Sequence, residues 1–165
     1  MIAIGDKLPE AKLWESTEFG EACPLAPQPV SVREASQGKR IVIFGLPGAY
    51  TPTCSAKHLP GYVQHLDELK AHGVAEVWCV SVNDGYVMAA WGKEHGANGK
   101  VRMLGDGNGE LTRALGLEND ITKSGMGLRS KRFSLLVDDG VVKQVNVEAP
   151  GKFEVSDVAT MLKQV

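Results

Sequence analysis

The chain has 165 residues, which suits one domain whose core is large enough to fold without disulfides or a metal. Its composition, 43% hydrophobic and 23% charged, is that of an ordinary globular protein, and its formal net charge is -2. That charge gives no reason to expect a nucleic acid or an anionic membrane as partner, and no window approaches ~18 uncharged apolar residues. We therefore expect a single domain, residues 1–165, that binds neither nucleic acid nor membrane.

Three cysteines, Cys23, Cys54 and Cys79, are spread along the chain. Their odd number and wide spacing argue against a disulfide framework. Residues 1–7 also lack the basic stretch followed by an apolar one that marks a secretory signal. We therefore expect the protein to work in a reducing compartment and predict a cytoplasmic location.

The first 39 residues show no long periodic run, and we interpret them as loops and short strands. Residues 13–20 have the pattern of a hairpin. Cys23 opens a proline-rich loop, residues 23–29, and has no charged neighbour except Glu21. We interpret Cys23 as a spectator thiol, because nothing beside it would favour the reactive thiolate.

A buried strand followed by a long helix is predicted next. Residues 40–45, Arg-Ile-Val-Ile-Phe-Gly, are short, apolar and β-branched, as in the strands of a parallel sheet. Helical spacing follows over residues 53–72, with Gly73 as the stop and Pro60 as an expected bend. One face of this helix carries the apolar side chains Leu59, Tyr62, Val63, Leu66 and Leu69.

A second core strand is predicted for residues 76–82. Asn83 or Asp84 can cap a following helix that ends near Gly96. A short strand at residues 101–105 and a short helix at residues 110–115, which Gly116 stops, come after it. Alternation along the second strand assigns two sets of side chains to opposite faces: Val77, Cys79 and Ser81, and Trp78, Val80 and Val82.

The last third of the chain carries a strong hairpin signal. Residues 132–138 and 141–147 read as strands on either side of an Asp-Gly turn. Residues 118–131 form a polar connection, and residues 156–165 have the spacing of a helix. The order of elements predicts an α/β sandwich with a central mixed sheet and flanking helices.

The stretch from Pro47 to Ser55, Pro-Gly-Ala-Tyr-Thr-Pro-Thr-Cys-Ser, joins the first core strand to the long helix. Its prolines and glycine end the strand, and Pro52 and Thr53 fit a helix start with Cys54 in the first turn. A sulfur there faces unpaired backbone N–H groups and the positive end of the helix dipole. Both favour the thiolate, so Cys54 is predicted to be reactive.

Several familiar chemistries do not fit this stretch. A dithiol redox site needs Cys-x-x-Cys, a structural zinc site needs closely paired ligands, and a phosphate-binding loop needs Gly-x4-Gly-Lys-Ser/Thr. None of these patterns is present. A phosphatase-like loop fails because Pro60 stands where its arginine should be, and the last histidine, His95, suggests no papain-like order.

A lone thiolate beside a hydroxyl suits attack on an O–O bond. Thr51 lies three residues before Cys54, and a tight turn into the helix would let its hydroxyl reach both the sulfur and a bound oxygen. The thiolate would displace an alkoxide or hydroxide and become a sulfenic acid. Backbone N–H donors and a nearby cation would stabilise the charge on the leaving oxygen.

The spacing Pro47-x-x-x-Thr51-x-x-Cys54 resembles the active-site signature of peroxiredoxins. The match runs from about residue 3 to the end, and it implies a thioredoxin-like three-layer sandwich that reduces hydrogen peroxide and alkyl hydroperoxides. Three further segments resemble the atypical, type II subgroup: His58-Leu-Pro-Gly61, Val80-Ser-Val-Asn-Asp84 and Lys131-Arg-Phe-Ser134.

The resemblance also implies roles for single residues. It makes Cys54 the peroxidatic cysteine, lets Thr51 hydrogen-bond the thiolate and the peroxide, and has Pro47 shield the sulfur from water. The family's distant arginine falls on Arg129, with Arg132 as the weaker candidate. A guanidinium beside the sulfur would stabilise the thiolate and orient the peroxide.

His58 lies four residues after Cys54, on the same face of the predicted helix. Histidine often serves as a base. A thiolate that is already ionised needs none for its attack, so we interpret His58 as structural.

The sulfenic acid must then be reduced, and no cysteine follows Cys79 in this sequence. A resolving cysteine near the C-terminal hairpin, which some two-cysteine members of the subgroup have, is therefore absent. Cys79 is the remaining candidate, but it lies mid-strand, and a disulfide to Cys54 needs Cα atoms within ~7 Å, so the helix would have to unwind. We therefore expect no cofactor and an external thiol reductant: glutathione with glutaredoxin, or thioredoxin.

Two other functions stay open. The same cysteine could serve a slow redox sensor or a binding protein, which catalytic consumption of peroxide would exclude. A thioredoxin-type oxidoreductase acting on protein disulfides is disfavoured by the missing Cys-x-x-Cys motif. The resemblance further implies a homodimer formed through the active-site edge.

Overall fold

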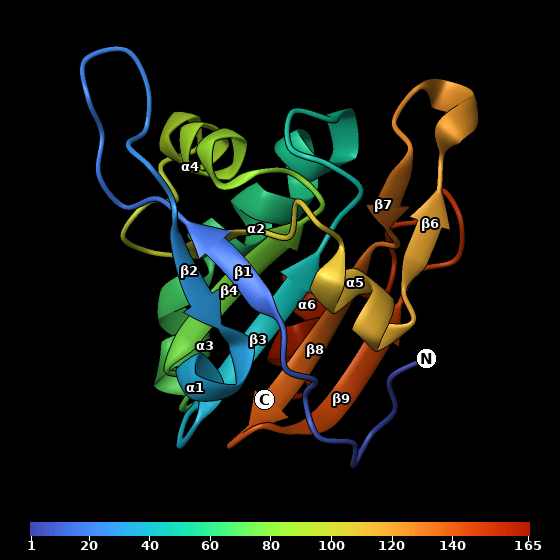
Figure 1. The fold of residues 1–165 in the computed structure, drawn as a ribbon. Coiled ribbons are helices and arrows are strands. Elements are labelled where there is room, and N and C mark those ends of the chain that lie inside the picture. The colour runs from blue at the N-terminus through green and yellow to red at the C-terminus, as the bar shows by residue number, and fades with distance from the viewer.

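A computed structural model describes residues 1–165. It has a central mixed sheet between two layers of helices (Figure 1). The sheet has seven strands in the order β2-β1-β5-β4-β3-β8-β9. The three inner strands β3, β4 and β5 run parallel, and β8 pairs antiparallel with β3. The strands of this sheet are β1 (Lys12–Glu15), β2 (Gln28–Ser31), β3 (Arg40–Gly45), β4 (Glu76–Ser81), β5 (Arg102–Gly105), β8 (Phe133–Asp138) and β9 (Val141–Val147).

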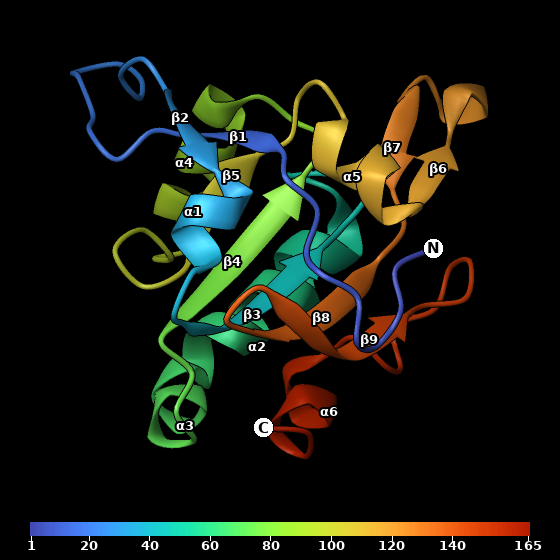
Figure 2. The same cartoon turned by 60° about the horizontal axis from the view of Figure 1, so that its bottom comes forward.

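Helices cover both faces of the sheet (Figure 2). Two apolar clusters are buried between the helices and the sheet, one on each face. The helices α2, α3, α4 and α6 pack on one face, and α1, α5 and the N-terminal segment pack on the other. This arrangement confirms the predicted three-layer, thioredoxin-like sandwich. The helices are α1 (Val32–Ser36), α2 (Leu59–Gln64), α3 (Leu66–Ala71), α4 (Gly85–Glu94), α5 (Glu110–Leu115) and α6 (Val158–Leu162).

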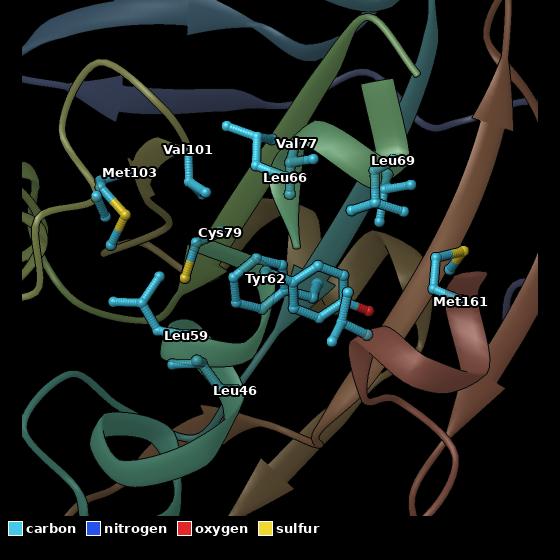
Figure 3. Close-up of a cluster of buried hydrophobic side chains, with 14 of the residues drawn as sticks. Leu46, Leu59, Tyr62, Leu66, Leu69, Val77, Cys79, Val101, Met103 and Met161 are labelled. Carbon is cyan, nitrogen blue, oxygen red and sulfur yellow. The ribbon is translucent and has the colours of Figure 1, made fainter. Parts of the chain in front are cut away.

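The core strands follow the alternation predicted from the sequence. Along β4, Val77 and Cys79 enter one cluster while Trp78 and Val80 enter the other. Figure 3 shows Cys79 among the apolar side chains of the first cluster. Because the parallel strands are covered on both faces, their sequences are apolar throughout, which is the pattern that identified them.

Three turn and cap predictions are confirmed. Asp84 caps α4 by accepting a hydrogen bond from the backbone N–H of Val87 at 2.8 Å. Gly116, in a left-handed conformation, ends α5. The Asp139-Gly140 turn joins β8 and β9 with both residues at positive φ, 47° and 76°, as a two-residue hairpin turn of this kind requires.

The predicted long helix over residues 53–72 is interrupted. Its first turn, Cys54–His58, is a widened π-helical turn, in which the N–H of Leu59 donates to the carbonyl of Cys54. The widened turn directly precedes Pro60, whose ring would clash with the carbonyl four residues earlier in a regular helix. A second break falls at His65, between α2 and α3, where no sequence signal predicted one.

One other sequence expectation is wrong. The hairpin expected over residues 13–20 is wider, because β1 pairs with β2 across residues 16–27. The polar connection 118–131 contains a small hairpin that the sequence did not predict, formed by β6 (Glu118–Asp120) and β7 (Leu128–Ser130). Three-residue polar strands carry too little apolar pattern to be recognised.

No helix of the structure is both long and apolar enough to span a bilayer.

Candidate active site

Cys54 lies at the first turn after the loop that leaves β3, and its side chain is fully buried. Its Sγ accepts a hydrogen bond from Nη2 of Arg132 at 3.2 Å. The two residues are brought together by strand register: Arg132 directly precedes β8, whose first residue Phe133 is paired with Gly45, the last residue of β3. The pairing of β3 with β8 therefore places a guanidinium on the sulfur.

The other arginine of this region, Arg129, does not contact the sulfur. Its Nε donates to the carbonyl of Met126 at 3.0 Å, and its Nη1 donates to the carbonyl of Pro47 at 3.3 Å. The expectation that Arg129 lies beside Cys54 is therefore wrong, and Arg132, which was the weaker candidate, contacts the sulfur instead. Arg129 belongs to β7, which pairs with β6 outside the main sheet, whereas Arg132 adjoins a central strand.

His58 holds the guanidinium of Arg132 in place. His58 is buried, with 1% of its surface exposed. Nη1 of Arg132 lies 3.0 Å from Nδ1 of His58, and Nε2 of His58 lies 3.1 Å from the carbonyl of Ser156. A guanidinium can only donate and a carbonyl can only accept, so His58 carries its proton on Nε2 and accepts on Nδ1. Burial, and next the charge of Arg132, lower the pKa of His58 to about 3.

This tautomer decides what His58 can do. Its only lone pair is already used by Arg132, so it has no free site with which to accept a proton from Cys54 or from a substrate. His58 therefore lies in a chain of hydrogen bonds that runs from Ser156 to Arg132 to Cys54. The sequence showed the i,i+4 relation of His58 to Cys54 but gave no sign of Ser156, which is 98 residues away.

The carbonyl of Ser156 is itself fixed by the segment that precedes α6. The carboxylate of Glu148 accepts hydrogen bonds at 2.7–2.9 Å from the backbone N–H groups of Glu154, Val155 and Ser156 and from the Ser156 hydroxyl. Burial would raise the pKa of Glu148, but these hydrogen bonds outweigh it and lower the pKa. Sequence reasoning missed Glu148, because a glutamate at the end of a strand looks like an ordinary surface residue.

Hydrogen bonds fix the loop that precedes Cys54 in the chain. The hydroxyl of Thr51 donates its hydrogen to the carbonyl of Gly48 at 2.7 Å and not to the Cys54 sulfur, so the expected hydrogen bond from Thr51 to the thiolate is wrong. The oxygen of Thr51 keeps lone pairs with which to accept another hydrogen bond. The N–H of Ala49 donates to Oδ1 of Asn83 at 3.0 Å. Tyr50 adopts φ 63°, a left-handed conformation that costs a non-glycine residue energy and is held only by such surroundings.

A pocket of about 220 Å³ opens beside this loop. Pro47, Thr53 and Arg132 line it together with Asn119, Lys131 and the segment 148–153. The Cys54 sulfur is fully buried and does not line the pocket, but Arg132, which donates to that sulfur, does. The structure contains no group of three or more His, Cys, Asp or Glu side chains arranged to hold a metal.

The remaining cysteines are both free thiols. Cys79 lies on β4 in the same apolar cluster as Cys54, and burial, with Cys54 as a further cause, raises its pKa. Cys23 is exposed in the loop between β1 and β2. Neither contacts the Cys54 sulfur through a hydrogen bond or a disulfide.

A thioredoxin-like sandwich with one cysteine at the start of a helix, a guanidinium on its sulfur and no second cysteine bonded to it defines a thiol-based oxidoreductase. Comparison with known proteins gives the family. A family model described as Redoxin matches residues 3–162.

Named relatives cover almost the whole chain. Peroxiredoxin-2B of Arabidopsis thaliana is 47% identical over 98% of this chain and 97% of its own length, and the chloroplastic peroxiredoxin-2E-2 of Oryza sativa is 48% identical over 98% and 72%. The crystal structure of reduced Prx3 from Vibrio vulnificus in complex with H2O2 superposes with a TM-score of 0.90 at 46% identity, covering 99% of both chains. The chain belongs to the Redoxin family, among its peroxiredoxins, and is therefore a thiol peroxidase.

Proposed function

We propose that Cys54 reduces hydrogen peroxide and alkyl hydroperoxides as a thiolate that becomes a sulfenic acid and is recycled by an external thiol. The observation that carries this proposal is the 3.2 Å hydrogen bond from Arg132 Nη2 to the Cys54 sulfur. A charge-assisted hydrogen bond of this kind favours the thiolate over the thiol. The Vibrio vulnificus relative crystallised with H2O2 supports a peroxide as substrate.

The surroundings of the sulfur suit attack on an O–O bond. The thiolate attacks one peroxide oxygen, the O–O bond breaks, and the leaving oxygen departs as hydroxide or alkoxide and takes up a proton. Arg132 can follow the negative charge from the sulfur to that oxygen, because its guanidinium presents several donors in one plane. Thr51, whose hydroxyl donates to Gly48, can accept the hydrogen of the hydroperoxide and so orient it.

Pro47 is proposed to restrict access to the sulfur. It lines the pocket through which the peroxide would arrive, and its carbonyl is held by Arg129. Arg129 would then act on the loop and not on the reacting atoms. A covered sulfur slows side reactions with bulky oxidants.

Reduction of the sulfenic acid is assigned to an external thiol, either glutathione with glutaredoxin or thioredoxin, and no cofactor is needed. Burial keeps the Cys79 thiol protonated and therefore poorly nucleophilic, which argues against it as the resolving residue. We place the protein in a reducing compartment such as the cytoplasm, because all three of its cysteines are free thiols. The homodimer stays a prediction.

Steady-state peroxide consumption tests this proposal with each reductant in turn. Cys54→Ser should be inactive, whereas Cys79→Ser and Cys23→Ser should keep turnover with the external thiol. Mass spectrometry after one equivalent of peroxide and excess glutathione should show glutathione on Cys54. Stoichiometric oxidation without turnover would instead support the slow redox sensor, and an intramolecular Cys54–Cys79 disulfide would overturn recycling by an external thiol.

A further inference from the structure

We propose that the pocket beside Cys54 is the binding site for a small thiol that carries carboxylate groups, and that Lys131 and Lys152 recognise those carboxylates. This inference rests on the proposed function, because it identifies where the external thiol would bind. The pocket measures about 220 Å³, and Pro47, Thr53 and Arg132 are among its lining residues. A ligand seated there would contact Arg132, whose Nη2 donates to the Cys54 sulfur at 3.2 Å.

The charges that line the pocket are mostly positive. Lys131, Arg132 and Lys152 contribute three cations, and Glu148 contributes the only carboxylate. Neither lysine takes part in any of the four ion pairs of the molecule, and neither ammonium group has a hydrogen-bond partner. Two unpaired ammonium groups at one small pocket attract an anion.

Glu148 does not offset these lysines in the way that a free carboxylate would. Its oxygens accept hydrogen bonds from three backbone N–H groups and one hydroxyl of residues 154–156. Those hydrogen bonds occupy its oxygens, none of which pairs with a lysine, and the three cations outnumber this one carboxylate. The lysines are thus left for a ligand.

The balance of charge also changes during the reaction in the direction that an anionic thiol requires. Before oxidation, the Cys54 thiolate neutralises Arg132, which donates to it at 3.2 Å. A sulfenic acid is neutral, so oxidation leaves the charge of Arg132 unbalanced and makes the site more positive by one charge. The pocket therefore attracts an anionic thiol more strongly once there is a sulfenic acid to reduce.

The pocket suits one end of a small peptide thiol better than a whole protein. Its volume is below the ~300–1,000 Å³ of typical drug-sized sites, so it would accept a carboxylate-bearing arm while the sulfur of the ligand points at Cys54. Phe153 supplies an apolar wall, since its ring lies 5.8 Å from the guanidinium carbon of Arg132. Glutathione, which has two carboxylates and one ammonium group, fits this description.

The chemical step balances without any further reactant. The thiolate of the ligand attacks the sulfur of Cys54–SOH, a mixed disulfide forms, and the hydroxyl leaves as water after taking one proton from the solvent. A second thiol then attacks the sulfur contributed by the ligand, which releases the Cys54 thiolate and a disulfide of two ligand molecules. The pocket assists only the first of these steps by binding.

The experiment compares the rate constants of thiols of one size and different charge with the pre-formed sulfenic acid. The probes are 3-mercaptopropionate, 2-mercaptoethanol and cysteamine, which are anionic, neutral and cationic at the remote end, together with glutathione. The variants are Lys131→Gln, Lys152→Gln and the double variant. Lys100→Gln, an exposed lysine before β5 on the far side of the sheet, is the matched control.

The double variant should react about tenfold more slowly with 3-mercaptopropionate and glutathione at low ionic strength, equally fast with 2-mercaptoethanol, and faster with cysteamine. The loss should shrink at ~0.5 M salt, where charges more than a few ångströms apart are screened. Oxidation by hydrogen peroxide should be unchanged in Lys100→Gln, and in the pocket variants it should change less than the reaction with anionic thiols does, because hydrogen peroxide is neutral.

Three results would overturn the inference. The first is equal slowing of all three small thiols. The second is no effect of the variants on the anionic thiols. The third is slower oxidation by an anionic hydroperoxide without any change in the thiol step, which would make the pocket a peroxide site. Failure of the wild type to form a sulfenic acid at all would instead refute the proposed function, so the two failures are distinguishable.

Discussion

Replacing His58 by glutamine tests the hydrogen-bond chain behind Cys54 without breaking it. A glutamine amide can donate to the carbonyl of Ser156 and accept from Arg132, as the imidazole does at 3.1 Å and 3.0 Å. The substitution removes only the ability to titrate. His58→Gln should therefore fold, keep the guanidinium on the sulfur and reduce hydrogen peroxide at a rate within a few-fold of the wild type.

The consequence appears in the dependence of stability on pH. Burial and Arg132 lower the pKa of His58 from 6.5 to about 3 in the folded protein. Between these values the unfolded chain binds a proton at His58 that the folded chain refuses, so the free energy of unfolding falls as the pH falls below 6.5. At pH 4.5, two pH units below the unfolded value, the loss from this one group is about 2.7 kcal/mol.

Urea unfolding at pH 7.5 and pH 4.5 measures this loss. Carboxylates also contribute to acid destabilisation, but they contribute equally in wild type and His58→Gln, so the difference between the two proteins isolates the imidazole. The wild type should lose about 2.7 kcal/mol more than the variant between the two pH values. Parallel losses in wild type and His58→Gln would refute the lowered pKa and the neutral state assigned to His58.

Three further predictions follow from the contacts of the site. Arg132→Lys should lower kcat/KM for hydrogen peroxide by about 10- to 100-fold in stopped-flow oxidation, because a lysine cannot bridge Cys54 and His58. Arg129→Lys should change kcat/KM only a few-fold, because Arg129 contacts the loop and not the sulfur. The reverse order of these two effects would restore Arg129 as the partner of the sulfur. Gly48→Ala should lower the free energy of unfolding by about 1 kcal/mol, because the new Cβ would lie 2.7 Å from Nη1 of Arg129 and displace that guanidinium from the Pro47 carbonyl. In a double-mutant cycle with Arg129→Met, the two losses should not be additive. Additive losses would contradict this cause. Cys79→Val is a substitution of similar volume at a buried position. It should keep full turnover with an external thiol and change the free energy of unfolding by less than about 1.5 kcal/mol. Loss of turnover would make Cys79 the resolving residue.

Much of the fold could be predicted because its signals are local. The apolar run of β3, the alternation along β4 and the Asp-Gly turn between β8 and β9 each need only a few neighbouring residues to be recognised. The hairpin of β6 and β7 and the break at His65 were missed because they depend on packing against the rest of the chain and leave no periodic pattern.

The site divides in the same way. Cys54, Thr51 and Pro47 stand within eight residues of one another, so a motif can contain them. The guanidinium on the sulfur comes from a residue 78 positions away, and its place depends on the register that pairs Gly45 with Phe133. The spacing of Arg129 and Arg132 before the strand could not reveal which of them adjoins the central sheet.

The support behind the sulfur consists of groups that keep one protonation state over the working range of pH. The pKa of His58 is lowered to about 3, so its ring stays neutral, and hydrogen bonds lower the pKa of Glu148, so its carboxylate stays ionised. From about pH 5 upward neither group gains or loses a proton, so the hydrogen bonds that hold Arg132 against Cys54 do not change. Any pH dependence of the peroxide step in that range must therefore arise in the reacting atoms or in the substrate and not in the residues that hold Arg132 in place.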